Sequence, residues 1–579
     1  PSVSHLTNTA GNGIAILNGA KNINITNCKI HDIGTEAVVA VGSSNINIKG
    51  CEMYNVGFSA IRVNCGERST LTSGNVVISD CIISDINRDT GNNAYGGIRL
   101  DGVGTVVENN IFHDIPNSAI RYAGNAHIIK HNEIYNAVNM TTDAGSVYAG
   151  RSFSNYGTSV ENNYFHDLGS SLVGECYVSA MFWDDMHSGN SFTGNIVDMN
   201  NTNRTIGVQI NGGCDNNVDS NIFINTMYGV YMQDGDNIPS TYDENDTGNF
   251  FNKTAFQSFK EAAGNVSNAY YITDSDWYPA KWNTFPTMIE NFKRLRDDKK
   301  YNRNSTIKNN VLYNNTSEAV FKSRHTLTYS LLNGTIKNNK EIKDAAVFVD
   351  TADRDYRVVA SKKSANNITA EVPDSNTDIT YWGLGEGYEP SEDLKKFTLS
   401  YPADGTNVAG STAKLVWNNA PFSDKYIYEV AKDSAFLNVV ATGETAYNVA
   451  QVSGLEENTE YYWRVKGVSI SRRFAGEFVS QNTNRFTTSG ELNIKNISYD
   501  KLMNEITFTA DNTSNASVTF TVAVAVKSTD GRLVDMRSLK KTIDAGKAQN
   551  MTISAYFKGA AAGGNLEFYA WDSLDNMIP

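Results

Sequence analysis

The chain has 579 residues, of which 40% are hydrophobic and 19% charged. Lys and Arg together number 49 against 63 Asp and Glu, which gives a formal net charge of -14 and disfavours a nucleic-acid partner, because phosphate binding needs clustered basic side chains. A chain of this length holds several domains, and no apolar run reaches the roughly 20 residues of a membrane span.

The N-terminal stretch PSVSHLTNTAGNGIAIL reads as strand rather than as a signal peptide. We therefore expect the chain to begin inside a folded element. We expect a missing N-terminal segment, or another cell-surface protein, to cover the strand edges that such a start exposes.

Short related segments such as ITNCKIHDIG, VENNIFHDIP and VENNYFHDLG recur along the first part of the chain. Their fourth residues lie at positions 28, 51, 81, 110, 132, 163, 195 and 221, and further copies occupy 307–316 and 336–345. Irregular steps of this size with short strands predict a right-handed parallel β-helix over residues 1–390. We expect Cys28, Cys51 and Cys81 to stack coil over coil at the repeated position.

Residues 236–305 interrupt the repeats and are predicted to form a partly helical insertion. The insertion contains Trp277 and Trp282 among several tyrosines. These aromatic side chains either stack on sugar faces beside a groove or pack the insertion onto the β-helix, and the sequence favours neither alternative.

Residues 391–490 and 491–579 change to alternating strands, which predict two C-terminal β-sandwich domains and an all-β fold. The first of them resembles a fibronectin type III domain, with Trp417 as the core tryptophan and a tyrosine-corner segment that contains Leu455, Thr459 and Tyr461. The second is similar to C-terminal modules of bacterial surface and secreted proteins. Neither contains a pattern that suggests catalysis.

Aligning the coils on the repeated position places one polar column on the outside of the β-helix and one mostly apolar column inside. The outward column is predicted to hold Arg99, Arg121, Ser152 and Asp184, and the inward column Leu100, Tyr122, Phe153 and Asp185.

The outward face is the candidate site. Asp143 and Asp184 on adjacent coils suit glycoside hydrolysis, in which one carboxyl donates a proton and the other attacks or activates water. A strand spacing of about 4.8 Å is compatible with the roughly 5–5.5 Å between the carboxyls of retaining enzymes. The side chains expected to contact substrate are Arg121, His127, Tyr148, Arg151, Asp185, His187, Trp277 and Trp282. The alternative is that both aspartates merely cap turns.

The ordered motifs GERSTLTSGN, IRLDGVG, GNAHIIKHNEI, DAGSVYAGR, NYFHD, DDMHSGN and INGGCDN resemble secreted bacterial β-helix proteins that include glycoside hydrolase family 141. The resemblance covers roughly residues 1–385 and implies xylanase or α-L-fucosidase activity on plant cell-wall polysaccharide. It implies that the catalytic aspartates are Asp143, expected to be the nucleophile, and Asp184, expected to be the acid/base. No cofactor or metal is expected, with structural calcium left open, and the expected location is extracellular or the cell surface.

Four positions depart from the pattern of that group. Asn117 stands in place of a histidine, Ala126 in place of an acidic residue, Ser152 in place of an aspartate and Cys214 in place of an arginine. These departures favour altered specificity or a non-catalytic relative.

Two other function classes remain open. A polysaccharide lyase would use Arg121, Arg151 or Lys130 as its base and often needs calcium bound by clustered carboxylates. A structural or adhesive surface protein would use the β-helix as a rigid rod with the sandwiches as spacers.

Overall fold

The computed structural model describes the larger part of the chain. The described residues are 11–87, 96–169, 177–199, 204–233, 284–290, 304–316, 321–323, 334–378, 382–385, 387–389, 391, 396–418, 420, 423–471, 476–480, 482–489, 492–500, 503–513, 517–527, 533–554 and 565–571. The chain divides into two compact units, residues 1–390 with 471–474 and residues 391–470 with 475–579.

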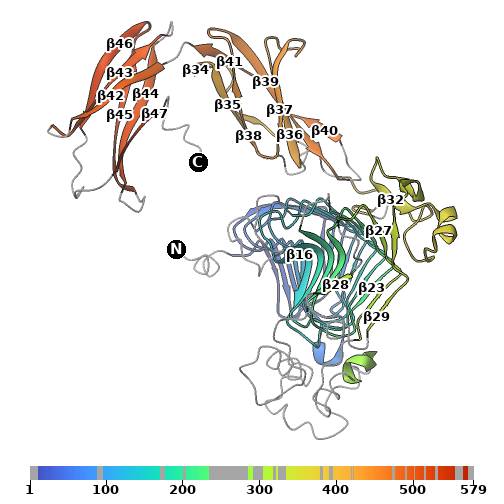
Figure 1. The fold of residues 1–579 in the computed structure, drawn as a ribbon. Helices are drawn as coiled ribbons and strands as arrows, with labels where there is room; N and C mark the ends of the chain where they lie inside the picture. Colours follow the sequence, from blue (N-terminus) through green and yellow to red (C-terminus); the bar gives the residue numbers. More distant parts are fainter. Residues whose placement is uncertain are drawn as a thin grey trace. The chain divides into compact units, whose positions relative to one another are not determined.

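The first unit is a coil of three parallel sheets, and each described turn contributes one strand to each sheet (Figure 1). Sheet A contains β1 (Ile14–Ile16), β4 (Val38–Val41), β7 (Ile61–Cys65), β10 (Ile98–Gly102), β13 (Ile120–Tyr122), β16 (Ala144–Gly150), β19 (Val178–Asp184), β22 (Thr205–Asn211), β25 (Tyr228–Gln233) and β28 (Phe321–Ser323).

Sheet B contains β2 (Lys21–Thr26), β5 (Ser44–Lys49), β8 (Val76–Ser79), β11 (Val106–Glu108), β14 (Ile128–Lys130), β17 (Ser159–Glu161), β20 (Ser191–Thr193), β23 (Asn217–Asp219), β26 (Thr306–Lys308) and β29 (Thr335–Lys337). Sheet C contains β3 (Lys29–Ile33), β6 (Glu52–Val56), β9 (Ile82–Ser84), β12 (Ile111–His113), β15 (Glu133–Tyr135), β18 (Tyr164–His166), β21 (Ile196–Asp198), β24 (Ile222–Ile224), β27 (Val311–Tyr313) and β30 (Lys340–Ile342). The predicted all-β fold class and the β-helix are confirmed.

The repeated sequence position is an internal ladder at the corner between sheets B and C. The Asn132 amide donates to Asn163 Oδ1 at 2.9 Å, and the Asn163 amide donates to Asn195 Oδ1 at 3.0 Å. At the N-terminal end sulfur replaces the amides, and the Cys51 N–H donates to Cys81 Sγ at 3.5 Å. From Asn110 to Asn339 each ladder amide donates to the amide oxygen of the next coil, which is why asparagine returns there despite irregular spacing.

The described part of this unit ends in short elements that pack beside sheet C. These elements are η4 (Ala345–Val347), β31 (Phe348–Asp350), β32 (Asp355–Val358), η5 (Ala360–Lys362) and η6 (Ser364–Asn366). The short helix η1 (Arg68–Thr70) lies much earlier in the chain, in a turn of the coil. A further short helix covers residues 286–290. Among the described residues, none of the helices has the length and apolarity needed to cross a membrane.

The second unit contains the mainly antiparallel sheets of two sandwiches. In the first, β33 (Leu399–Tyr401), β35 (Thr412–Trp417) and β38 (Val449–Ser453) form one sheet, and the other contains β34 (Thr406–Ala409), β41 (Asn484–Ser489), β39 (Glu460–Ser469), β36 (Lys425–Ala431) and β37 (Val439–Thr445), with β40 (Gly476–Val479) paired to β39. Trp417 is completely buried in the core between them. Tyr461 Oη accepts a hydrogen bond from the Glu456 N–H at 2.9 Å, as in a tyrosine corner.

The second sandwich pairs two three-stranded sheets. One contains β42 (Leu492–Asp500), β43 (Glu505–Asn512) and β46 (Lys547–Ser554), and the other β45 (Leu533–Ile543), β44 (Val518–Lys527) and β47 (Asn565–Trp571). Alternate residues of β43 and most of the length of β44 fill its core.

Candidate active site on sheet A

The outer face of sheet A carries a column of side chains in parallel register. Arg99 pairs with Arg121, Arg121 with Tyr148, and Tyr148 with Phe182. The residues flanking Arg99 and Arg121 in their strands are buried, whereas both arginines are partly exposed, so this column points away from the coil interior.

The predicted alignment of this column is wrong at Ser152 and at Asp184, because Tyr148 and Phe182 take these two positions. Ser152 lies beyond the end of β16 and is 5% exposed, and Tyr148 takes the position next to Arg121. The cause is the number of residues between sheet A and the asparagine ladder. Arg121 lies 11 residues before Asn132 (132 − 121), but Tyr148 lies 15 residues before Asn163 (163 − 148).

Asp184 ends β19 on this outer face and is held by two neighbours. Tyr148 Oη donates to Asp184 Oδ2 at 2.7 Å, and the Asn211 amide donates to Asp184 Oδ1 at 3.0 Å. The Asn211 amide also lies 3.3 Å from Asp185 Oδ1. Two donors therefore fix the orientation of the Asp184 carboxyl group.

Asp143 directly precedes β16 and has an exposed side chain. Its N–H donates to the Tyr177 carbonyl at 2.9 Å, whereas Asp184 pairs with Gly150 at the far end of the same strand pair. The two aspartates therefore belong to neighbouring coils but do not face each other across the strand pair. The distance between their carboxyl groups is therefore not fixed by the spacing of one strand, contrary to the expectation from the sequence.

Packing explains the small residues Ala-Gly-Ser that follow Asp143. A Cβ on Gly145 would lie 2.8 Å from Phe182 Cβ, although Phe182 pairs with Tyr148, three residues further along. The strand bends sharply at Gly145, and only glycine leaves room for this close approach.

Charge couples the carboxyl groups across this bend. Partial loss of hydration raises the pKa of Asp143, and the negative charge of Asp184 raises it further. Burial and the charge of Asp184 also raise the pKa of Asp185, against an opposing hydrogen bond from Arg151. A carboxyl whose pKa is raised by the charge of a second, hydrogen-bonded carboxyl fits the electrostatic pattern of an acid and base pair.

Three cationic or phenolic side chains surround the carboxyls. The Arg121 guanidinium lies 4.2 Å from the centre of the Tyr148 ring. Burial and the neighbouring Asp184 charge raise the pKa of Tyr148, which keeps the phenol a donor. Arg151 Nε lies 3.0 Å from Asp185 Oδ2, and the Arg151 side chain is 68% exposed. Asp185 occupies a turn with φ of 44°.

The structure corrects the expectation that His127 and His187 contact substrate, because both are completely buried inside the coil. His127 Nε2 lies 2.8 Å from the Ala123 carbonyl, and its Nδ1 accepts from the Thr105 N–H at 3.2 Å. The His187 ring packs edge-on against Tyr122, with 5.4 Å between ring centres. Burial lowers the pKa of His127 to about 4 and that of His187 to about 3, so both are neutral packing groups.

Trp277 and Trp282 lie outside the described residues. From the insertion, Phe285 packs against Tyr156 with 6.0 Å between ring centres, and a Cβ on Gly157 would lie 2.6 Å from the Phe285 ring. The described part of the insertion therefore contacts the turn that follows β16.

The four departures from the family pattern lie mainly inside the protein. Asn117, Ser152 and Cys214 are at most 5% exposed, and Ala126 occupies a turn with φ of 55°. At the three buried positions, the altered residues do not line the exposed part of the outer face.

Asn211 is a site residue that the sequence reasoning missed. It ends β22, one coil beyond Asp184, in the motif QINGG. Aligning the ends of the sheet A strands, rather than counting back from the asparagine ladder, would have placed it beside Asp184.

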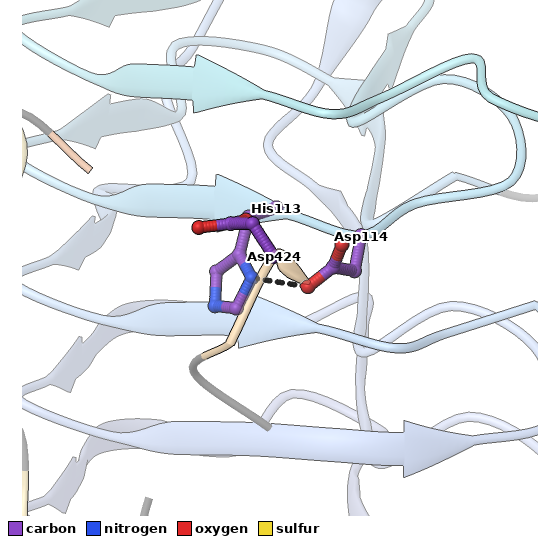
Figure 2. A group of neighbouring side chains, drawn as sticks. All are labelled: His113, Asp114 and Asp424. Atoms are coloured by element: carbon purple, nitrogen blue, oxygen red, sulfur yellow. Dashed lines mark hydrogen bonds and ion pairs between the residues drawn. The ribbon is translucent and has the colours of Figure 1, made fainter. Parts of the chain in front are cut away.

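The outer face of sheet C carries a second polar cluster, which is buried. His113 Nδ1 lies 2.8 Å from Asp114 Oδ2 (Figure 2). Further along the sheet, His166 lies between Asp167 at 2.7 Å and Glu133 at 3.1 Å. Burial disfavours charge on His166, but its bonds to the two carboxylates raise its pKa.

Arg354 completes this cluster by donating at 2.7 Å to both Asp167 and Asp198. Burial would raise the pKa of Asp167, but its bonds to His166 and Arg354 lower it to about 2. The acidic groups thus have basic partners, and the cluster is a structural ion network.

A protein-family model described as "Right handed beta helix region" matches residues 12–97 and 96–259. None of the curated proteins matches the chain. Among solved structures, the chicken CNTN1 FN1–FN3 domains share 9% identity, with 30% of this chain and 58% of that chain covered and a TM-score of 0.16.

A two-domain fibronectin type III segment of chicken tenascin shares 15% identity, with 31% and 90% of the chains covered and a TM-score of 0.13. A beta-glucuronidase of Parabacteroides merdae shares 11% identity, with 61% and 57% covered and a TM-score of 0.13. At such scores these likenesses carry no argument about function. The family match, together with the three parallel sheets, identifies the first unit as a right-handed parallel β-helix.

Proposed function

We propose that the chain is a glycoside hydrolase that cleaves plant cell-wall polysaccharide, as its motifs' resemblance to glycoside hydrolase family 141 implies. The supporting observation is the unequal pair of carboxyls on sheet A. Asp143 is exposed with a raised pKa, whereas Asp184 accepts hydrogen bonds from Tyr148 and Asn211. Glycoside hydrolysis needs one protonated and one ionised carboxyl.

The electrostatics favour Asp143 as the general acid, because a raised pKa keeps its proton available for the departing sugar oxygen. Asp184 is then the second carboxyl group, which attacks the anomeric carbon or activates water. This proposal reverses the roles expected from the sequence. Tyr148 and Asn211 position the Asp184 carboxylate, and Arg151 stays beside the site through its ion pair with Asp185.

The proposal extends to the setting of the enzyme. Its polymeric substrate places it outside the cell or on the surface of a bacterium, and it needs no cofactor for this chemistry. Trp277 and Trp282 remain candidate sugar platforms contributed by the insertion.

A polysaccharide lyase is the second candidate, and Arg121 is the observation that favours it. Burial lowers the pKa of Arg121, and the charges of Arg99 and Arg151 lower it further against the opposing effect of Tyr148, which is the direction that a general base requires. A lyase leaves an unsaturated sugar that absorbs in the ultraviolet, whereas a hydrolase does not.

The test is incubation of the purified chain with xylan, fucosylated glycans and acidic polysaccharides. New reducing ends without ultraviolet absorbance are expected. Reducing ends with absorbance would replace the hydrolase by the lyase. No cleavage of any polymer would favour the structural or adhesive surface protein. The Asp143→Asn/Asp184→Asn double variant is the matched control for contaminating activity.

A further inference from the structure

Three arginines occupy neighbouring positions on the outer face of sheet A. In the parallel register, Arg62 on β7 pairs with Arg99 on β10, which pairs with Arg121 on β13. Successive strands lie about 4.8 Å apart, so the row advances by about one strand spacing per coil along the axis of the β-helix. All three side chains are partly exposed.

Like charges directly opposite one another on neighbouring strands destabilise a sheet unless anions compensate them. The compensation visible here is loose: Arg62 lies 3.9 Å from Glu36, and Arg99 lies 3.4 Å from Asp101. Within the described residues, the buried Nε of Arg62 has no hydrogen-bond acceptor. The row therefore holds more positive charge and donor capacity than these carboxylates use.

The row leads directly into the candidate active site. Arg121 stacks on the Tyr148 ring, and Tyr148 Oη donates to Asp184. A ligand lying along Arg62, Arg99 and Arg121 would therefore extend to the Asp184 carboxylate without leaving the outer face of sheet A.

We infer that Arg62, Arg99 and Arg121 form a binding row for acidic sugars of a glycan whose chain runs along the coil axis toward Asp184. The planar guanidinium group binds carboxylate or sulfate oxygens through two parallel hydrogen bonds. The inference names the substrate class as an anionic glycan. It rests on the proposed function only for the direction in which the glycan runs, toward Asp184.

The surrounding charge limits how dense the anion can be. The net charge of -14 and the flanking Glu36 and Asp101 repel a closely spaced polyphosphate such as a nucleic acid.

The test is binding, measured by calorimetry on the full chain carrying Asp143→Asn/Asp184→Asn. The probes are a galacturonic acid oligomer, a sulfated galactan oligomer and a neutral xylan oligomer of equal length. Because these proteins need not hydrolyse anything, a failure of the hydrolase proposal leaves the binding result intact.

An acidic oligomer is expected to bind more tightly than the neutral one, and R99Q is expected to weaken that binding about tenfold, which corresponds to about 1.4 kcal/mol. R99K should weaken it less, because the charge remains while the two-pronged geometry is lost. The matched control is Lys130→Gln, which removes a cation of similar exposure from sheet B. Unchanged urea midpoints would show that the variants fold.

Tighter binding of the uronic acid oligomer assigns the row to carboxylates, and tighter binding of the sulfated oligomer assigns it to sulfate esters. Equal affinity for acidic and neutral oligomers, no binding of either acidic oligomer, or an R99Q protein that binds like its parent would each overturn the inference.

Discussion

The outer faces of sheets A and C both carry clustered ionisable side chains, but the clusters differ in how their charges are balanced. On sheet C, His166 lies between Asp167 and Glu133, and Arg354 donates to Asp167 and Asp198, so each of these carboxylates has a basic partner. On sheet A, Asp143 is exposed with a raised pKa, close enough to Asp184 to be affected by its charge. The comparison separates an ion network that holds the fold from carboxyls able to exchange protons with a ligand.

Mutation of the same residue types is therefore expected to change stability on sheet C and catalysis on sheet A. Removing a partner on sheet C leaves a buried charge uncompensated and costs stability. Removing a partner on sheet A leaves the fold intact, because water still solvates that face, and changes chemistry instead.

The largest effect on stability is expected from Arg354→Met. This change leaves the buried Asp198 carboxylate with the Asn225 amide, 2.6 Å away, but without its cationic partner. We expect the free energy of unfolding of the β-helix to fall by about 2–4 kcal/mol in urea titrations. Hydrolytic rate should be unchanged.

The matched control is Lys343→Met, whose ammonium group is exposed and 3.8 Å from Glu341. Its effect should stay within about 0.5 kcal/mol. If Arg354→Met and Lys343→Met unfold at the same urea concentration, the sheet C network does not stabilise the fold.

A smaller effect is expected from Tyr148→Phe on sheet A. The change removes the 2.7 Å hydrogen bond to Asp184 and keeps the ring under Arg121. We expect kcat to fall about tenfold, equivalent to about 1.4 kcal/mol, with no shift in the urea midpoint. A stability loss with full activity would assign Tyr148 to packing.

The smallest expected effect is a change in the titration of Asp143. Its pKa is raised by partial burial and by the Asp184 charge, so the neutralising change Asp184→Asn should lower the Asp143 midpoint. The proton would then be lost at a lower pH, which would move the alkaline limit of an acid catalyst downward. Carboxyl carbon NMR measures this midpoint, and Asp433 of the second unit should titrate identically in both proteins.

The fold was predictable because its strongest sequence signal is an interior one. The asparagine ladder must return to the same corner of every coil, since each amide satisfies its neighbour, so Asn132, Asn163 and Asn195 are recognisable despite irregular spacing. The outward position of Asp184 was also predictable, because this residue follows the alternation of its strand.

The finer geometry of the site was not predictable from spacing. The longer connection after β16 shifted Tyr148, rather than Ser152, beside Arg121. The sequence around a histidine in a polar motif does not show whether its side chain points into the coil or out of it, and the side chains of His127 and His187 are buried. The bend at Gly145 depends on close contact with Phe182, which only three-dimensional packing specifies.

The most direct test of the central claim is the hydrolytic rate of Asp143→Asn and Asp184→Asn on the polysaccharide that the wild-type chain cleaves. Each change keeps the shape of the side chain and removes its proton transfer or its negative charge. We expect each variant to lose about 10²–10⁴-fold in kcat while keeping the wild-type urea midpoint. Full activity in both folded variants would contradict the assignment of these two aspartates as the catalytic pair.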